Sequence, residues 1–318
     1  MVYIGIDVGG TKTEVLVVNK DGEVLSRALG GPGNHESIGE EKAAAEIKRT
    51  IEKATDGLSD REIGGAFFGM AGIDHEEDKE IAERIIKMIG IDNAAFDNDG
   101  RIALRSCFYD DKGIVIACGT GGISYSGNGK ELYRIGGFSW SFGERLGSYL
   151  IAGMVTAAAV RAVDGREYNT LLTKLLEEKL KMDIFELRRI SRFGLTAVKD
   201  KVPLIILALY EAYENHDFVA TKILIEIVEE VVKITHAHAK KINIMPPIPV
   251  CLTGTFFRKA PEYLKEMVSN ALGSDYRVFI SDRAPVIGAA HLALEAGGVV
   301  ATDETLGKIT EGYKNLEN

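Results

Sequence analysis

The sequence predicts an α/β protein built from two related domains, each of which opens with three consecutive strands. The length of 318 residues corresponds to two domains at about 150 residues each. Alternating apolar residues and glycine turns predict three strands at the start of the chain, and the same pattern begins again near residue 113. Strands then alternate with helices, which indicates mixed sheets that carry helices on their faces.

In the first half of the chain, two tight turns connect the three opening strands. Gly9-Gly10 forms the first turn, and Asp21-Gly22 supplies residues that tolerate positive φ at the second. A glycine-rich loop follows, and helices then alternate with strands until a polar segment at 97–100 ends the last strand. The predicted strands are 3–7, 13–18, 23–29, 63–70 and 94–96, and the predicted helices are 39–54 and 76–89.

The second half repeats this opening, with Gly119-Thr-Gly-Gly122 in the place of the first glycine turn. Residues 145–242 are predicted to be mostly helical, until two prolines at 246–247 end the run. A strand, a turn at 253–255, a helix, a strand and a final helix complete the chain. The predicted strands are 113–117, 123–126, 131–135, 249–252 and 277–280, and the predicted helices are 261–272 and one that begins near 285.

Composition and charge exclude several classes of protein. Apolar residues make up 46% and charged residues 27%, which is typical of globular chains. The formal net charge of −9 argues against a nucleic-acid partner, because such proteins carry a basic surface. The apolar runs are shorter than the ~20 residues of a spanning helix, and the start of the chain lacks the basic region of a secretory signal. Three widely separated cysteines form no CxxC pair, so we expect a cytoplasmic protein without disulfides or a thiolate zinc site.

The two glycine turns are the candidate chemical features. Adjacent glycines in a strand–turn–strand leave backbone N–H groups unshielded, and such groups form a concave anion site. Asp7 stands at the end of the first strand, where a carboxylate can hold Mg²⁺ through water, and Thr11 and Thr13 add hydroxyls. Either turn alone is more simply a structural hairpin. Two of them, each in a three-strand unit, favour phosphate binding, although the chain has neither a P-loop nor a Rossmann motif.

Three motifs carry a resemblance to a known family: Asp7-Val-Gly-Gly-Thr-Lys-Thr13, Gly119-Thr-Gly121 and Leu252-Thr-Gly-Thr255. They resemble the first phosphate, second phosphate and adenosine motifs of the actin, sugar kinase and Hsp70 ATPase superfamily. The resemblance is closer to its N-acetylglucosamine kinase branch, which also contains archaeal hexokinases and the ATPase activators of acyl-CoA reductases and dehydratases. It implies two ribonuclease-H-like domains with a central cleft that close on ATP, and a helical insertion in the second domain.

The resemblance also implies roles for individual residues. Asp99 matches the family's general base, and a carboxylate in this position can take a proton from a sugar hydroxyl. Asn34 and Asn98 match positions that hydrogen-bond sugar hydroxyls, and His35 is a candidate to line the same pocket. The alternative for the segment around Asp99 is a polar turn without a catalytic role. The implied nucleotide-binding residues are Gly9, Gly10, Thr11, Lys12, Thr13, Gly119, Thr120, Gly121, Gly254 and Thr255, with Asp7 at the Mg²⁺.

One segment departs from the family pattern. The family commonly has Gly-Asp-Glu-Gly-Ser, whose Asp contacts the sugar, whereas this chain reads Gly143-Glu-Arg-Leu-Gly-Ser148. Glu144 can replace that Asp and bind the sugar, and Arg145 replaces the Glu. The alternative is that Glu144 pairs locally and never meets the substrate, so the identity of the sugar stays open.

The resemblance therefore implies an ATP-dependent kinase that phosphorylates a hexose or an N-acetylhexosamine with Mg²⁺ and ATP. We expect an N-terminal domain at 1–110 and a C-terminal domain at 111–318, whose final helix packs back on the first domain. The expected partners are the sugar and ATP, without nucleic acid or membrane, and a homodimer is the expected assembly. One alternative is a nucleotide or sugar sensor without turnover. An activator of a reductase or dehydratase is disfavoured, because no cysteine suits an iron–sulfur cluster.

Overall fold

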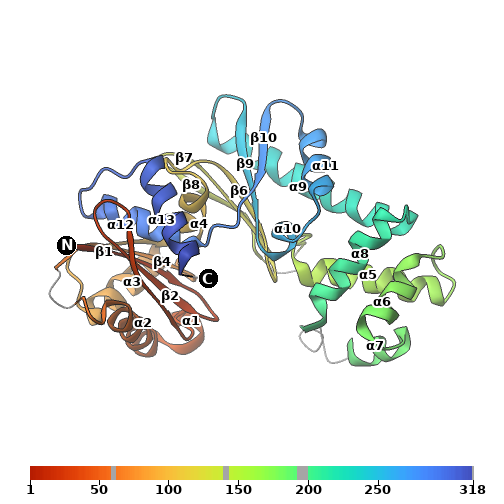
Figure 1. The fold of residues 1–318 in the computed structure, drawn as a ribbon, viewed down its shortest axis with the longest axis horizontal. Coiled ribbons are helices and arrows are strands. Elements are labelled where there is room, and N and C mark those ends of the chain that lie inside the picture. Colours follow the sequence, from red (N-terminus) through yellow and green to blue (C-terminus); the bar gives the residue numbers. More distant parts are fainter. Residues whose placement is uncertain (59–61, 139–142, 192–199, 317–318) are drawn as a thin grey trace. The chain divides into compact units, whose positions relative to one another are not determined.

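The computed structural model describes residues 1–58, 62–138, 143–191 and 200–316, and Figure 1 shows its ribbon. Residues 139–142, which directly precede the segment that departs from the family pattern, lie outside the described residues. The described strands form two five-stranded sheets. They are β1 (Val2–Val8), β2 (Thr13–Val18), β3 (Val24–Gly30), β4 (Ile63–Met70), β5 (Ala94–Asn98), β6 (Lys112–Cys118), β7 (Gly122–Asn128), β8 (Leu132–Gly136), β9 (Ile248–Thr253) and β10 (Tyr276–Ile280).

The two sheets have the same strand order, which confirms the predicted repeat. The first runs β3-β2-β1-β4-β5, and the second, read from its far edge, runs β8-β7-β6-β9-β10. In each sheet the strand that comes first in sequence is central. The second and third strands lie on one side of it, and the fourth and fifth lie on the other. The first sheet is mixed: β1 pairs antiparallel with β2 and parallel with β4. In the second, β9 pairs parallel with both β6 and β10.

The helices largely follow the predicted pattern, with additions at four places. A short helix begins at His35, a nine-residue helix begins at Asp99, another short one begins at Thr255, and a last helix begins at Asp303; none of these was predicted. The described helices are α1 (His35–Ile38), α2 (Glu40–Thr55), α3 (Glu76–Ile89), α4 (Asp99–Cys107), α5 (Ser148–Val163), α6 (Leu171–Leu180), α7 (Ile184–Ser191), α8 (Val202–Glu214), α9 (Phe218–Ile242), α10 (Thr255–Arg258), α11 (Glu262–Leu272), α12 (Pro285–Ala296) and α13 (Asp303–Asn315).

The chain divides into two compact units. Unit 1 contains Met1–Gly113, Tyr125–Leu132 and Arg283–Asn318, and unit 2 contains Ile114–Ser124 and Tyr133–Asp282. The last two helices, α12 and α13, therefore belong to unit 1, although they follow the second sheet in sequence. Unit 2 carries the run of helices from α5 to α9.

In unit 1, successive residues of β1 face opposite layers of helices. Ile4 and Ile6 pack in the core with α2 and α3, whereas Tyr3 packs in the core with α12 and α13. Figure 1 shows these helix pairs on the two faces of the first sheet. Because side chains alternate along a strand, Gly5 and Asp7 share the α12 face with Tyr3. The strand register thus places the carboxylate of Asp7 on a defined side of the sheet.

Helix α12 approaches both β1 and α4 at backbone distance, because glycines leave room for it. A Cβ atom built on Gly5 would lie 2.1 Å from the backbone nitrogen of Ala290. A Cβ atom built on Gly288 would lie 2.1 Å from the carbonyl oxygen of Ile102 in α4. These close approaches position the start of α4 relative to the end of β1, and therefore Asp99 relative to Asp7.

Gly288→Ala is expected to lower the free energy of unfolding by about 1–3 kcal/mol, because the added methyl group must displace the backbone of α4. The matched control is Gly307→Ala in α13, where an added Cβ meets no atom within 4 Å. In that helix the change is expected to leave stability unchanged or to raise it by up to ~1 kcal/mol. Equilibrium denaturation measures both variants. Wild-type stability of Gly288→Ala would contradict the tight packing of α12 on α4.

Candidate functional site

The candidate catalytic residue, Asp99, is the first residue of α4, immediately after β5. Asn98 is the N-cap of this helix: its Oδ1 accepts a hydrogen bond from the backbone N–H of Gly100 at 2.8 Å. Its Nδ2 donates to Asp74 Oδ1 at 2.8 Å and to the carbonyl oxygen of Ile73 at 3.1 Å. Asn98 therefore fixes the backbone at Asp99. Its amide donors already serve the fold, and sugar binding by Asn98 stays a prediction.

The side chain of Asp99 is contacted by a tyrosine that the sequence analysis did not identify. The hydroxyl of Tyr125, on β7, donates a hydrogen bond to Asp99 Oδ1 at 3.3 Å. Both residues belong to unit 1. Asp99 is partly exposed, whereas Tyr125 is buried. A pattern of alternating residues locates Tyr125 in a strand, but it carries no signal for a partner on α4.

The first glycine turn connects β1 to β2 and leaves open space above its tip. The backbone N–H of Gly9 donates to the carbonyl oxygen of Lys12 at 3.0 Å, which closes the turn. A Cβ atom built on Gly10 would meet no atom within 4 Å, and both Gly10 and Thr11 are exposed. A phosphate group can therefore approach the backbone here without a steric barrier.

Asp7 lies next to this turn in a setting that disfavours its charge. Burial, and secondarily the nearby carboxylate of Asp99, raise the pKa of Asp7 to about 7, although Lys12 partly offsets this. A bound divalent cation would supply the missing positive charge, so the donor set fits Mg²⁺. Within the described ranges, no three His, Cys, Asp or Glu side chains gather into a metal site. Mg²⁺ held by one carboxylate and substrate phosphates is consistent with this finding.

Beside Asp7, the buried carboxylate of Glu14 holds the charge of Lys12. Glu14 is paired with Asp7 in the strand register and is 1% exposed. Its Oε2 lies 2.5 Å from Lys12 Nζ, and its Oε1 accepts hydrogen bonds at 2.7 Å from Arg27 Nε and from the hydroxyl of Tyr313. The ammonium group at the first turn is thereby tied to the last helix of the chain. The sequence analysis did not identify Glu14 or Tyr313.

The loop that carries Asn34 is joined to the first glycine turn. The backbone N–H of Gly33 donates to the carbonyl oxygen of Gly9 at 3.0 Å. Asn34 is the N-cap of α1, and its Oδ1 accepts from the N–H of Glu36 at 2.8 Å. Within the described part of the chain, Thr13 Oγ1 and His35 Nδ1 are buried without a hydrogen-bond partner.

The second glycine turn connects β6 to β7 in unit 2 and supports the start of α5. The carbonyl oxygen of Gly119 accepts from the N–H of Ser148 at 2.8 Å, and that of Thr120 accepts from the N–H of Tyr149 at 3.3 Å. A Cβ atom built on Gly121 would meet no atom within 4 Å. The turn is thus braced on one side by helix N–H groups and has open space at Gly121.

The predicted adenosine motif and the second turn line one cavity of about 170 Å³ in unit 2. Thr120 and Thr255 contribute hydroxyls, and most of the wall from α8 is apolar. Gly254 has φ +90°, and a Cβ atom there would lie 2.4 Å from the carbonyl oxygen of Cys118, so the motif requires glycine. This cavity has the apolar walls and few polar groups that suit a nucleoside. Its lining residues are Thr120, Ser148, Tyr149, Val202, Pro203, Ile206, Leu207, Tyr210, Thr255, Phe256 and Lys259.

Glu144, the candidate sugar ligand of unit 2, is partly buried and makes a local hydrogen bond. Its Oε2 accepts from the backbone N–H of Gly137 at 2.6 Å. A carboxylate can accept several hydrogen bonds, so this bond leaves acceptor capacity for a ligand. Asn34 belongs to unit 1 and Glu144 to unit 2. Their joint contact with a sugar stays a prediction.

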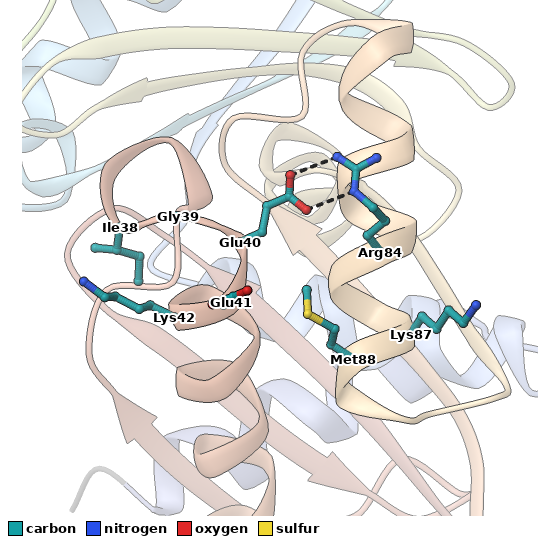
Figure 2. Close-up of a pocket in the computed structure, with 8 residues that line it drawn as sticks. All are labelled: Ile38, Gly39, Glu40, Glu41, Lys42, Arg84, Lys87 and Met88. Carbon is teal, nitrogen blue, oxygen red and sulfur yellow. Dashed lines mark hydrogen bonds and ion pairs between the residues drawn. The ribbon is translucent and has the colours of Figure 1, made fainter.

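A separate surface pocket of about 680 Å³ lies between α2 and α3 (Figure 2). Glu40 and Arg84 face each other across it as a bidentate ion pair, with Nε–Oε2 and Nη2–Oε1 distances of 3.0 and 2.9 Å. None of the predicted site residues lines this pocket. It therefore belongs to the packing of two surface helices and not to the candidate site.

Known proteins match nearly the whole chain. The sequence model of the BadF/BadG/BcrA/BcrD ATPase family matches residues 4–293. An N-acetyl-D-glucosamine kinase from Dictyostelium discoideum is 28% identical over 314 residues, which cover 93% of this chain and 98% of that protein. An N-acetylmuramic acid/N-acetylglucosamine kinase from Clostridium acetobutylicum is 32% identical over 234 residues, which cover 71% of this chain and 76% of that protein.

A solved structure has the same fold. A ROK family glucokinase from Streptomyces griseus, in complex with glucose and AMPPNP, superposes with a TM-score of 0.58 at 17% identity, covering 93% of this chain and 100% of that one. Together with the family match, this confirms the predicted α/β class with two actin-like ATPase domains. Separately, no helix among the described residues is long and apolar enough to cross a membrane.

Proposed function

The chain belongs to the BadF/BadG/BcrA/BcrD ATPase family, and from this premise we propose that it is an ATP-dependent kinase acting on a hydroxyl of a hexose or N-acetylhexosamine. The observation that carries the proposal is the position of Asp99. This carboxylate begins a helix in the same unit as the first glycine turn, and it acts electrostatically on Asp7 beside that turn. The named activities of two relatives, both N-acetylglucosamine kinases, support the same substrate class.

In the proposed reaction, Asp99 accepts the proton of the sugar hydroxyl as its oxygen attacks the γ-phosphorus of ATP. The new O–P bond forms while the bond to the β-phosphate oxygen breaks, and ADP leaves. Phosphoryl transfer depends mainly on positioning and on neutralising charge. The N-terminal end of α4 favours an ionised carboxylate at Asp99, because the helix dipole is positive there.

In this proposal, the glycine turns bind the phosphate groups of the nucleotide, and the cavity of unit 2 binds its nucleoside. Backbone N–H groups of the first turn bind phosphate oxygens near Gly10, and Lys12, held by Glu14, adds a positive charge. Gly121 leaves space for a second phosphate contact, and the cavity beside Thr255 accepts the adenosine. Asp7 would hold Mg²⁺ through water, and the ion, when bound, neutralises phosphate charge.

The alternative of a reductase or dehydratase activator is not favoured. Such an activator needs cysteines that hold an iron–sulfur cluster between two subunits. Here Cys118 and Cys251 are buried within strands, and only Cys107 is partly exposed. The free thiols fit a reducing compartment, so we include a cytoplasmic location in the proposal. We also propose that the protein assembles as a homodimer. Sedimentation equilibrium tests the assembly.

The proposed function is tested by coupled measurement of ADP release with a panel of sugars. The panel contains N-acetylglucosamine, glucosamine, glucose and N-acetylmuramic acid, and mass spectrometry identifies the sugar phosphate. A kinase releases one ADP per sugar phosphate formed. ADP release that does not depend on sugar would instead indicate an ATPase, and binding without ADP release would indicate a sensor.

Glu144→Ala is expected to raise the KM for the sugar at least about tenfold, because a hydrogen bond to a charged group contributes about 1.5–3 kcal/mol. The KM for ATP is expected to change far less. Glu144→Asp is expected to retain part of the activity or to shift the preference between glucose and N-acetylglucosamine.

The matched control for this change is Glu266→Ala, at an exposed glutamate of α11 in the same unit. Steady-state kcat/KM for both sugars decides the outcome. Changes below about threefold in both Glu144 variants would leave this residue with only its local bond to Gly137.

A further inference from the structure

The ring of Tyr125 lies directly against the first turn of α4. Tyr125 is only 4% exposed. A Cβ atom built on Gly100 would fall between 2.1 and 2.3 Å from three carbon atoms of this ring. Position 100 is the second residue of α4, where glycine is otherwise a poor helix former. Glycine at this position leaves the space that the ring occupies, so the two residues together hold the tyrosine beside Asp99.

The start of α4 is restrained from two directions. Asn98 fixes the backbone, since its side chain bonds to the N–H of Gly100 and to Asp74 in the neighbouring loop. Tyr125 restrains the side chain, since its hydroxyl donates to Asp99 Oδ1 at 3.3 Å. The carboxylates of Asp99 and Asp7 act on each other electrostatically, and the hydrogen bond from Tyr125 favours one orientation of the Asp99 carboxylate.

From this geometry, and resting on the proposed kinase function, we propose that Tyr125 is a positioning residue that holds the carboxylate of Asp99 in the orientation that accepts the sugar proton. A general base acts only within hydrogen-bond reach of the proton that it removes. A misplacement of about 1 Å can lower turnover by 10²-fold. The hydroxyl of Tyr125 touches neither sugar nor nucleotide in this role, so it affects turnover through Asp99 and not through substrate binding.

Tyr125→Phe removes one oxygen atom and retains the ring against Gly100. It is expected to lower kcat at least about tenfold, because one hydrogen bond to a charged group contributes about that factor or more. The KM for the sugar and the calorimetric Kd for Mg²⁺ and ATP are expected to stay within twofold of wild type, which corresponds to a change in binding free energy of about 0.4 kcal/mol or less. Tyr109→Phe, at a tyrosine that follows α4 and is 44% exposed, is the matched control and is expected to behave as wild type.

A double-mutant cycle with Asp99→Asn tests whether Tyr125 acts through Asp99. In the Asp99→Asn background, Tyr125→Phe is expected to cause no further loss of kcat, because the residue that it positions no longer accepts a proton. An equal loss of about tenfold in both backgrounds would mean an independent, structural effect and would overturn the inference. A Tyr125→Phe variant with wild-type kcat would also overturn the inference. Thermal melting checks that each variant is folded.

The outcome also separates this inference from the proposed function. Wild-type protein that releases no ADP with any sugar overturns the kinase and the role of Tyr125 together. Wild-type protein that turns over normally, with a Tyr125→Phe variant of equal kcat, overturns only the role of Tyr125. Retained Mg²⁺·ATP affinity in each variant shows that the nucleotide site is intact in every arm.

Discussion

Asp99→Asn is expected to lower kcat by about 10²–10⁴-fold, the typical contribution of a positioned general base. Asparagine has nearly the same shape as aspartate and still accepts the hydrogen bond from Tyr125, but it cannot take the proton of the sugar hydroxyl. Since Asp99 lies at the start of α4 and not in the glycine turns, the Kd for Mg²⁺ and ATP is expected to stay within about threefold of wild type.

The control for Asp99→Asn is Asp92→Asn, the same chemical change at an exposed position just before β5. Rapid-quench measurement of sugar phosphate formation separates the chemical step from product release in both variants. A variant of Asp99 that keeps more than about a tenth of wild-type turnover would remove this residue from the role of general base.

Gly10→Val and Gly121→Val are each expected to weaken binding of Mg²⁺ and ATP at least about tenfold, because a side chain on the turn blocks the approach of phosphate to the backbone N–H groups. The structure makes these substitutions informative. A Cβ atom at either glycine meets no protein atom within 4 Å, and neither glycine has positive φ. The fold is therefore expected to tolerate valine, and the added atoms occupy the space proposed for phosphate.

Two glycines with equally open surroundings provide the controls for these variants. Gly307→Val changes α13 of unit 1, and Gly153→Val changes α5 of unit 2. Isothermal titration with Mg²⁺ and ATP, alongside thermal melting, compares all four proteins. Wild-type affinity in folded Gly10→Val or Gly121→Val would mean that the corresponding turn has only a structural role.

Features encoded over a few neighbouring residues were predictable from the sequence. Alternating or continuous runs of apolar residues predicted the strands of the two sheets, and paired glycines predicted the turn between the first two strands of each sheet. Repetition of this local pattern indicated two units of one topology, and the identical strand order confirms it. The residue types at these turns also indicated a phosphate site, which the proposed function uses for nucleotide binding.

Helix α4 was missed because its sequence carries opposing local signals. Its first two residues belong to Asp97-Asn-Asp-Gly100, which is typical of a turn. Its buried face includes Arg105, which interrupts the apolar pattern expected of a helix in a core. In the structure this guanidinium forms a buried ion pair with Asp111 and also bonds to His291 Nδ1 at 3.2 Å. Asp111 lies only six residues from Arg105, but His291 comes from a distant segment that no local window contains.

The sequence by itself determined the strands and the glycine turns, since each depends on residues that are adjacent in the chain, whereas Asp99 became the candidate base through the family resemblance. Only the tertiary structure decided which side chains contact them. The hydroxyl of Tyr125 reaches Asp99 from a strand 26 residues later, and that of Tyr313 reaches Glu14 across 299 residues. Such pairs form because packing of sheets and helices brings distant segments together, and a buried polar group must find its partner wherever the packed chain provides one.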